Sequence, residues 1–148
     1  MIAFQVFVFI LVVIFANLEI QIEGKDGWAK NLPCWRIEKG WLLKLSGGRP
    51  LTGYHFYLWV FLSTIAHLPV FFVPWSLRLE SLILGFLAEL LLLEDLFWFI
   101  FNPHYGIKNF RKGRIPWHKR WWGPLPDFFW YLAAVSILLL YLGAPILQ

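Results

Sequence analysis

Apolar residues gather in four stretches of the chain, at residues 2–22, 54–75, 82–101 and 128–147. Each is close to the roughly 20 residues that an α-helix needs to cross a bilayer. Two polar segments, 23–53 and 102–127, and one short turn separate them. The pattern predicts an all-α integral membrane protein: one membrane domain over residues 1–148, with four transmembrane helices and two amphipathic loops rich in tryptophan and basic residues.

The first apolar stretch has one alternative interpretation, a cleaved signal peptide. Between residues 2 and 18 only Gln5 and Asn17 interrupt the apolar run. A signal peptide has a basic segment before its apolar run and a cleavage site of the A-x-A type after it, and this stretch has neither. We therefore expect a membrane helix here.

Two sequence features concern how the helices pack. Pro69 lies late in the second stretch and predicts a kink there, because proline cannot donate a helical hydrogen bond. In the third stretch, Ser81, Gly85 and Ala88 have the spacing that places small residues on one face and lets helices approach closely. We expect this face to contact another helix, either in the chain itself or in a homo-oligomer or larger complex.

The polar loops are expected to lie on the membrane surface. Residues 33–45 place apolar side chains on one face and predict a short interfacial helix. The second loop combines tryptophans, which favour the headgroup level, with basic side chains that reach phosphate groups. The residues expected to contact anionic phospholipid headgroups are Arg111, Lys112, Arg114, Trp117, Lys119, Arg120, Trp121 and Trp122.

The basic residues also predict an orientation. Of thirteen Lys and Arg residues, six lie in segment 23–53, six lie in segment 102–127, and only Arg78 lies in the turn between the second and third stretches. Short loops with such an excess of positive charge remain in the cytoplasm. We expect both loops inside, both termini outside, and a location in the inner or plasma membrane of a bacterium or archaeon.

The overall composition fits this interpretation. Hydrophobic residues make up 59% of the chain, its mean hydropathy is +0.63, and its net charge is +4. Basic proteins often bind nucleic acid, but the tryptophans among these basic residues favour a lipid surface, so no nucleic-acid partner is expected. The single cysteine, Cys34, excludes an intramolecular disulfide and a multi-cysteine zinc site.

The stretch with the most distinctive chemistry is LLLLEDLFWFIFNPHYG, residues 90–106. Two adjacent acids, Glu94 and Asp95, lie about two turns before the expected end of the helix at Asn102. An ionisable group inside a spanning helix costs roughly 2.5–3.5 kcal/mol on insertion scales. Such groups therefore mark a functional site or a structural pair.

Two hypotheses give these acids a chemical role. In the first, Glu94 and Asp95 converge with His55, His104 and His118 near the cytoplasmic surface, as mixed ligands that suit a divalent metal such as Zn, Fe or Mn. No HExxH, ExxH or HxxxH spacing occurs in the sequence. In the second, Glu94, Asp95 and His118 are catalytic acid and base groups acting on a lipid-like substrate.

Two further alternatives are not enzymatic. In a membrane scaffold or complex subunit, the acids pair with basic residues of the loops and are structural. In a small transporter or ion pathway, His67 and Glu89 form a polar pair inside the membrane, because they lie eleven positions to either side of Arg78. The same pair would also serve as a structural contact between two helices.

Locally, the sequence LEDLFWF at residues 93–99 resembles the acid-plus-aromatic helix of the small carotenoid (lycopene) cyclase domains. Those domains are thought to protonate a polyene without redox chemistry, so the resemblance implies proton donation to an apolar substrate. It lacks the proline that precedes the acids in that pattern, and it extends neither into NPHYG nor into the WHKRWW loop. It therefore assigns the chain to no family.

Overall fold

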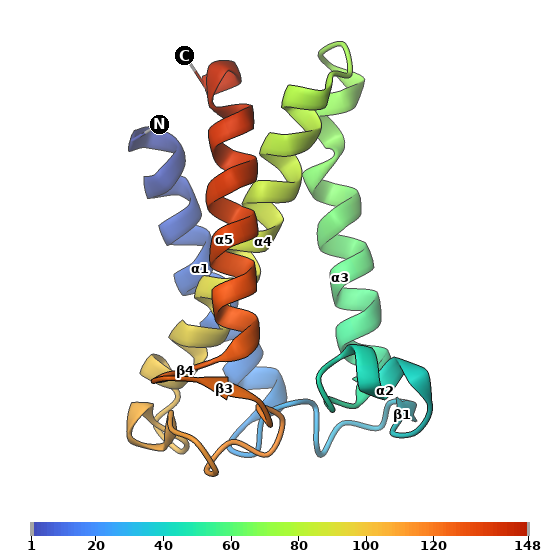
Figure 1. The fold of residues 1–148 in the computed structure, drawn as a ribbon, viewed down its shortest axis with the longest axis vertical. Helices are drawn as coiled ribbons and strands as arrows, with labels where there is room; N and C mark the ends of the chain where they lie inside the picture. Colours follow the sequence, from blue (N-terminus) through green and yellow to red (C-terminus); the bar gives the residue numbers. More distant parts are fainter. Residues whose placement is uncertain (1, 148) are drawn as a thin grey trace.

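The computed structural model describes residues 2–147, and they are mostly helical (Figure 1), as the hydrophobic pattern predicted. Two helices are long and apolar enough to cross a membrane, at residues 2–23 and 127–146. The long helices are α1 (Ile2–Glu23), α3 (Gly53–Ala66), α4 (Leu77–Phe101) and α5 (Asp127–Gly143). The short elements are β1 (Arg36–Ile37), α2 (Trp41–Leu45), β2 (Leu51–Thr52), β3 (Trp121–Trp122), β4 (Leu125–Pro126) and the 3₁₀ segments η1 (Leu68–Phe71), η2 (Ile107–Asn109) and η3 (Ala144–Leu147).

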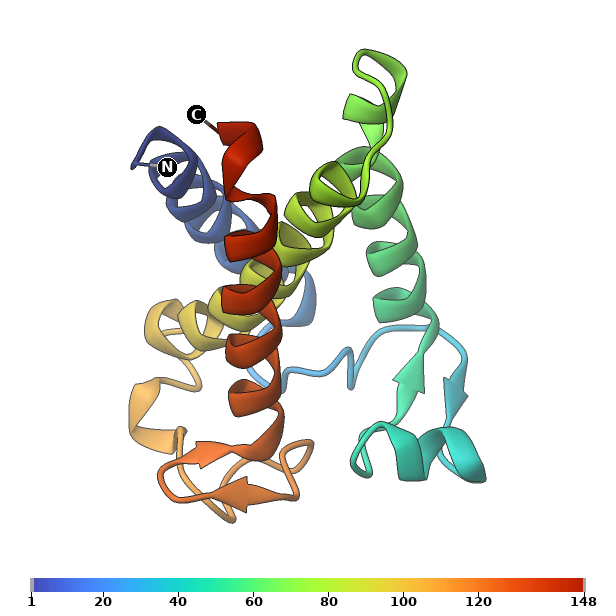
Figure 2. The same ribbon diagram turned by 45° about the horizontal axis from the view of Figure 1, so that its top comes forward.

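Helix α4 is the centre of the fold. It packs against α1 and, more extensively, against α5, whereas α3 diverges from the other helices and makes few contacts with α4 (Figures 1 and 2). The contact between α1 and α4 is filled by Val8, Val12, Phe15 and Leu90, all of which are buried. The divergence of α3 leaves a groove along one side of that helix.

Small residues bring α4 and α5 together. A Cβ added at Gly85 would lie 2.9 Å from the backbone nitrogen of Leu140, and one added at Gly143 would lie 2.7 Å from that of Leu82. The expectation that the row containing Gly85 faces a helix is therefore confirmed at Gly85, and the partner is α5 of the same chain. Whether the same row takes part in a homo-oligomer or larger complex stays a prediction.

Side-chain caps fix where α3 and α4 begin. Thr52 Oγ1 accepts the backbone N–H of His55 at 3.2 Å, and Ser76 Oγ accepts that of Leu79 at 3.1 Å. Helix α3 ends at Ala66 and is followed by η1, which contains Pro69. The helix thus ends three residues before the proline that predicted a kink, so the apolar stretch 54–75 is not a single helix.

The predicted interfacial helix over residues 33–45 is wrong in its first half. There β1 pairs with β2 in antiparallel register, with Arg36 opposite Thr52. Gly40 then adopts a positive φ of +90°, and only residues 41–45 form a helix, α2. The amphipathic pattern gave no sign that β2 would offer backbone hydrogen bonds to this segment.

The predicted pair of His67 and Glu89 is also wrong. His67 Nε2 lies 3.2 Å from Glu80 Oε1, and Glu89 accepts a hydrogen bond from Gln5 Nε2 at 3.4 Å. The prediction assumed two unbroken helices around Arg78. Because α3 stops at Ala66, His67 lies beside the first turn of α4 instead.

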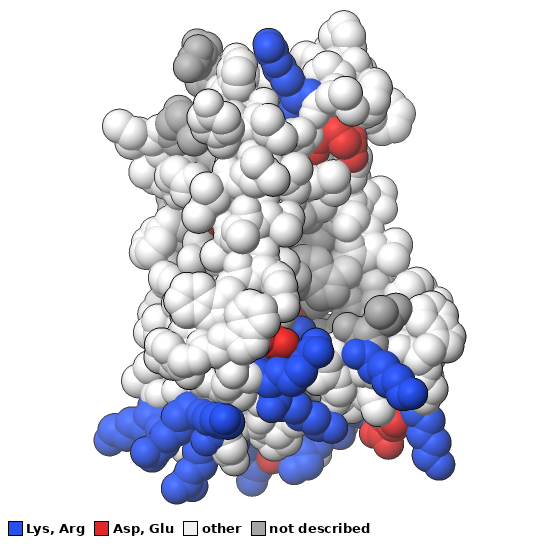
Figure 3. Space-filling view, in the orientation of Figure 1, with Lys and Arg blue, Asp and Glu red and all other residues white. Residues whose placement is uncertain are grey.

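Lys and Arg side chains gather at one end of the molecule (Figure 3). This end holds α2, the β3–β4 hairpin and the loops that connect them, as comparison with Figure 1 shows. Near the opposite end, this view shows a basic side chain and an acidic group close to it. The sequence counts that predicted the orientation thus correspond to a real separation of charge along the molecule.

Candidate functional site

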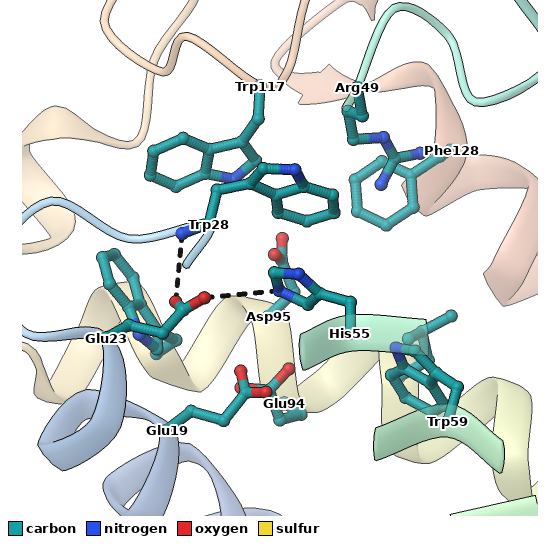
Figure 4. Close-up of a pocket in the computed structure, with 12 residues that line it drawn as sticks. Glu19, Glu23, Trp28, Arg49, His55, Trp59, Glu94, Asp95, Trp117 and Phe128 are labelled. Atoms are coloured by element: carbon teal, nitrogen blue, oxygen red, sulfur yellow. Dashed lines mark hydrogen bonds and ion pairs between the residues drawn. The ribbon is translucent and has the colours of Figure 1, made fainter. Parts of the chain in front are cut away.

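Four carboxyl groups surround one cavity at the basic end of the helices (Figure 4). Glu19 and Glu23 come from the last turns of α1, and Glu94 and Asp95 come from α4. The cavity has a volume of about 60 Å³, which is room for a few water molecules. The helices therefore bring together two pairs of acids from distant parts of the sequence.

Glu19 and Glu94 form the innermost pair. Their carboxyl groups lie side by side (Figure 4). Both side chains are buried, and the Tyr54 hydroxyl donates to Glu19 Oε1 at 3.2 Å. Two adjacent buried carboxyl groups repel each other when both are charged, which favours a proton on one of them. Glu94 Oε1 has no hydrogen-bond partner among the described residues.

Glu23 organises the loop that follows α1. Its carboxylate accepts the backbone N–H groups of Trp28 at 3.1 Å and Ala29 at 2.6 Å. Gly27, Trp28 and Ala29 all have positive φ, at 64°, 49° and 49°. Non-glycine residues in this region cost roughly 1–2 kcal/mol each, and such strain persists where surrounding contacts hold it in place. Here the Glu23 carboxylate keeps the strained turn in place through its two backbone hydrogen bonds.

His55, at the start of α3, has a partner on each ring nitrogen. Nε2 lies 3.3 Å from Glu23 Oε1, and Nδ1 lies 2.6 Å from Thr52 Oγ1. The imidazole also stacks on the Trp28 ring, with 4.3 Å between the ring centres. This fixed ring forms a wall of the cavity, and the contacts suit a positioning role for His55.

Asp95 and His118 form a second pair of interacting polar side chains. His118 Nε2 lies 3.0 Å from Asp95 Oδ2, and the imidazole is buried and stacked on Phe128 with 4.9 Å between ring centres. His118 Nδ1 has no partner among the described residues. These contacts favour the tautomer in which Nε2–H donates to Asp95. The pairing fixes one Asp95 oxygen, and Asp95 also lines the cavity.

Arg49 places a cation at the rim of this acidic cavity. Its Cζ lies 4.0 Å from the ring centre of Phe128 and 5.7 Å from that of Trp28, and Nε donates to the Ser46 carbonyl oxygen at 3.1 Å. Burial lowers the pKa of the Arg49 guanidinium, while the nearby Asp95 and Asp127 carboxylates act in the opposite direction. An arginine remains protonated in such a setting.

A larger groove adjoins the cavity. Its volume is about 580 Å³, within the range of small-molecule sites. The groove runs along α3, where Phe56, Val60, Ser63 and Thr64 contribute to its lining. The residues that line both spaces are Trp28, Arg49, His55, Trp59 and Leu91.

The structure brings together most of the residues that were predicted to converge, but not His104. Glu94, Asp95 and His55 line the cavity, and His118 contacts Asp95, but His104 is exposed in the loop after α4 and lines no part of the cavity. Within residues 2–147, no group of three or more His, Cys, Asp or Glu residues has an arrangement that would hold a metal ion. The catalytic roles and the metal remain predictions.

The residues predicted to contact lipid headgroups also divide. Trp117 is buried against Trp98 and Phe99, so its assignment to the headgroup contact is wrong. The aromatic core under the loop takes this indole instead. All seven others are exposed or half-exposed: Arg111, Lys112, Arg114, Lys119, Arg120, Trp121 and Trp122.

Sequence reasoning missed Glu19, Glu23 and Arg49. A signal was present for the two glutamates: they are four residues apart and lie at the end of an apolar helix, so they share one helical face. That placement resembles Glu94 and Asp95 near the end of α4. Nothing in the pattern distinguished Arg49 from the other basic residues of its loop, because its position depends on the packing of Phe128 from α5.

No family model, no curated protein and no solved structure matches this chain.

Proposed function

We propose that this chain is a four-helix integral membrane protein with both polar loops in the cytoplasm, and that its cavity is an acid–base site for a lipid-like substrate. The membrane assignment is supported by two helices of spanning length and by the gathering of basic residues at one end. It is also supported by large apolar side chains that are exposed on three helices, among them Phe7, Phe61 and Ile137.

The shared wall between the polar cavity and the apolar groove is the observation that carries the proposal. An apolar chain in the groove would bring a polar end group to Arg49 and His55, at the entrance to the cavity. Sites of this kind bind most of a ligand through apolar contacts and use a few polar groups to orient it. The acids are then close to the reacting part of the substrate.

The four carboxyl groups divide into different roles. Glu94, whose buried carboxyl lies beside that of Glu19 and has one oxygen without a partner among the described residues, is the proton donor. Asp95, oriented by His118, is the proton acceptor. Glu23 is occupied by two backbone N–H groups and His55, so it positions the wall of the site and takes no direct part in proton transfer.

Lipid profiles of cells that produce the protein test this function. Wild type is compared with Glu94→Gln and Asp95→Asn, and the matched control is Glu89→Gln, which lies on the same helix outside the cavity. We expect cells that produce wild type or the control to show the same change in the amount of one lipid species. Cells that produce either site variant should show no change in that species. If the site variants fold and give the wild-type profile, the acids are structural and the chain is a scaffold or complex subunit.

A further inference from the structure

Arg49 has the features of a recognition residue for an anionic group. We propose that it binds the phosphate of the substrate lipid, that Lys119 and Arg120 complete this phosphate site, and that the lipid chain lies in the groove along α3. The inference rests on the proposed function and adds the chemical class of the headgroup.

Arg49 is held in place, but its two terminal nitrogens have no hydrogen-bond partner among the described residues. Phe128 and Trp28 lie near its guanidinium, and only Nε has a hydrogen-bond partner among the described residues. No carboxylate within residues 2–147 lies at salt-bridge distance from it. Both terminal nitrogens are therefore available for a bidentate contact, which is the geometry in which arginine binds phosphate.

The second polar loop, residues 102–127, brings two more cations to the turn that precedes Arg49. A Cβ added at Gly47 would lie 3.1 Å from Arg120 Nη2, and one added at Gly48 would lie 3.5 Å from Lys119 Nζ. These glycines immediately precede Arg49 in the sequence. Lys119 and Arg120 therefore lie beside the turn that immediately precedes Arg49.

Charge at this turn also favours an anion. Arg120 Nε pairs with Asp127 Oδ2 at 2.9 Å, and the Asp95 carboxylate acts on Arg49 from the cavity. The three cations therefore exceed these two carboxylates by one charge. A phosphate group supplies negative charge together with several acceptor oxygens for the donors that remain.

The groove along α3 would take the rest of the ligand. Arg49 lines both the cavity and the groove, so a phosphate held there directs its ester side toward the acids or toward α3. The groove beyond is lined by Phe56, Trp59 and Val60, which offer apolar contact to a chain. An anion at one end and an apolar chain at the other describe a phosphorylated lipid.

Binding to purified full-length protein in an uncharged detergent tests the proposal. The probes are dioctanoyl phosphatidic acid, dioctanoylglycerol and inorganic phosphate, with affinity measured by native mass spectrometry. We expect the phosphatidic acid to bind more tightly than either of the others, because only it fills both the phosphate site and the groove. Equal binding of dioctanoylglycerol would overturn the phosphate site, and equal binding of inorganic phosphate would overturn the lipid assignment.

Variants identify the residue responsible. Arg49→Gln should weaken the binding of phosphatidic acid about tenfold or more, since it removes a charge-assisted contact. Arg49→Lys should fall in between, because lysine keeps the charge but loses the fork. The matched control is Lys39→Gln, an exposed basic residue of the first loop, which should bind like wild type. Wild-type affinity in folded Arg49→Gln would overturn the proposal.

This experiment separates the two proposals. Glu94→Gln keeps Arg49 and should bind phosphatidic acid like wild type, even though it is expected to abolish the change in cellular lipids. If Glu94→Gln leaves cellular lipids unchanged from wild type while Arg49→Gln still loses binding, the acid–base function fails and the phosphate site stands.

Discussion

His118 Nε2 lies 3.0 Å from Asp95 Oδ2, although 23 positions separate the two residues in the sequence. The contact closes the second polar loop over the end of α4. It also leaves a buried imidazole with one nitrogen that has no partner among the described residues. The pair therefore connects the stability of the loop to the orientation of an acid in the cavity.

A double-mutant cycle measures this connection. Asp95→Asn, His118→Gln and the double variant are compared with wild type for the free energy of unfolding in detergent. Because hydrogen bonds to a charged group contribute about 1.5–3 kcal/mol, we expect a coupling energy of this order between the two sites. Additive effects would show that the contact contributes nothing to stability.

Gly27 tests the packing of the strained turn after α1. A Cβ at this position would lie 2.6 Å from Trp117 Cη2 and 2.9 Å from Trp98 Cη2, and its φ is +64°. We expect Gly27→Ala to lower the free energy of unfolding by about 2–4 kcal/mol, combining strain and overpacking. Gly24→Ala is the matched control, because Gly24 has a φ of +69° and nothing within 4 Å of an added Cβ. Equal losses in both variants would contradict the indole contacts.

Substitution of Glu23 tests whether its carboxylate stabilises the same turn. Glu23→Gln keeps the size of the side chain but replaces one acceptor oxygen by an amide nitrogen, which cannot accept the backbone N–H of Trp28 or Ala29. We expect a loss of about 1–3 kcal/mol in the free energy of unfolding and faster proteolysis within residues 25–32. Glu38→Gln, at an exposed position, should change neither measurement. Unchanged proteolysis in Glu23→Gln would show that the turn does not depend on this carboxylate.

The turn between α3 and α4 predicts a dependence on pH. Hydrogen bonds from His67 and then from Trp75 lower the pKa of the Glu80 carboxyl below its usual value of 4.5. A carboxyl with a lowered pKa stabilises the folded state above its unfolded pKa, and this stabilisation is lost as pH falls through the folded pKa. The pair is partly exposed, so its contribution is about 1 kcal/mol or less.

Hydrogen exchange across residues 67–82 checks this dependence. At pH 6 to 7, wild type should show slower exchange than Glu80→Gln. The difference should disappear at a pH below the Glu80 pKa in the folded protein, where the wild-type carboxyl is protonated as well. A difference that persists unchanged in strong acid would assign the effect of the substitution to packing.

The sequence alone identified the parts of the site that depend on local pattern. Glu94 and Asp95 stand out because charged residues are rare inside an apolar helix, and the break after Phe101 follows from Asn102 and Pro103. The row containing Gly85 predicted a close helix contact, but its spacing could not distinguish α5 from a second copy of the chain. Local pattern thus locates chemistry on a helix without naming its partners.

The rest of the site depends on contacts between distant segments. Arg49 belongs to the site because Phe128 of α5 packs under its guanidinium, and no spacing in the sequence records that contact. His67 was paired with the wrong acid because a break at the end of α3 changed which turn of α4 it meets. Glu19 and Glu23 were overlooked because the end of α1 was interpreted as a membrane boundary.

In the proposed site, a protonated Glu94 carboxyl lies where an apolar molecule can reach it. Dicyclohexylcarbodiimide, an apolar reagent that reacts with protonated carboxyl groups, tests this directly on the protein in vesicles, with the modified residues located by peptide mass spectrometry. We predict modification at Glu94, no modification at that position in Glu94→Gln, and continued modification at Glu94 in Glu89→Gln. Absence of modification at Glu94 in wild type, under conditions that label other carboxyl groups of the chain, would contradict the acid–base site.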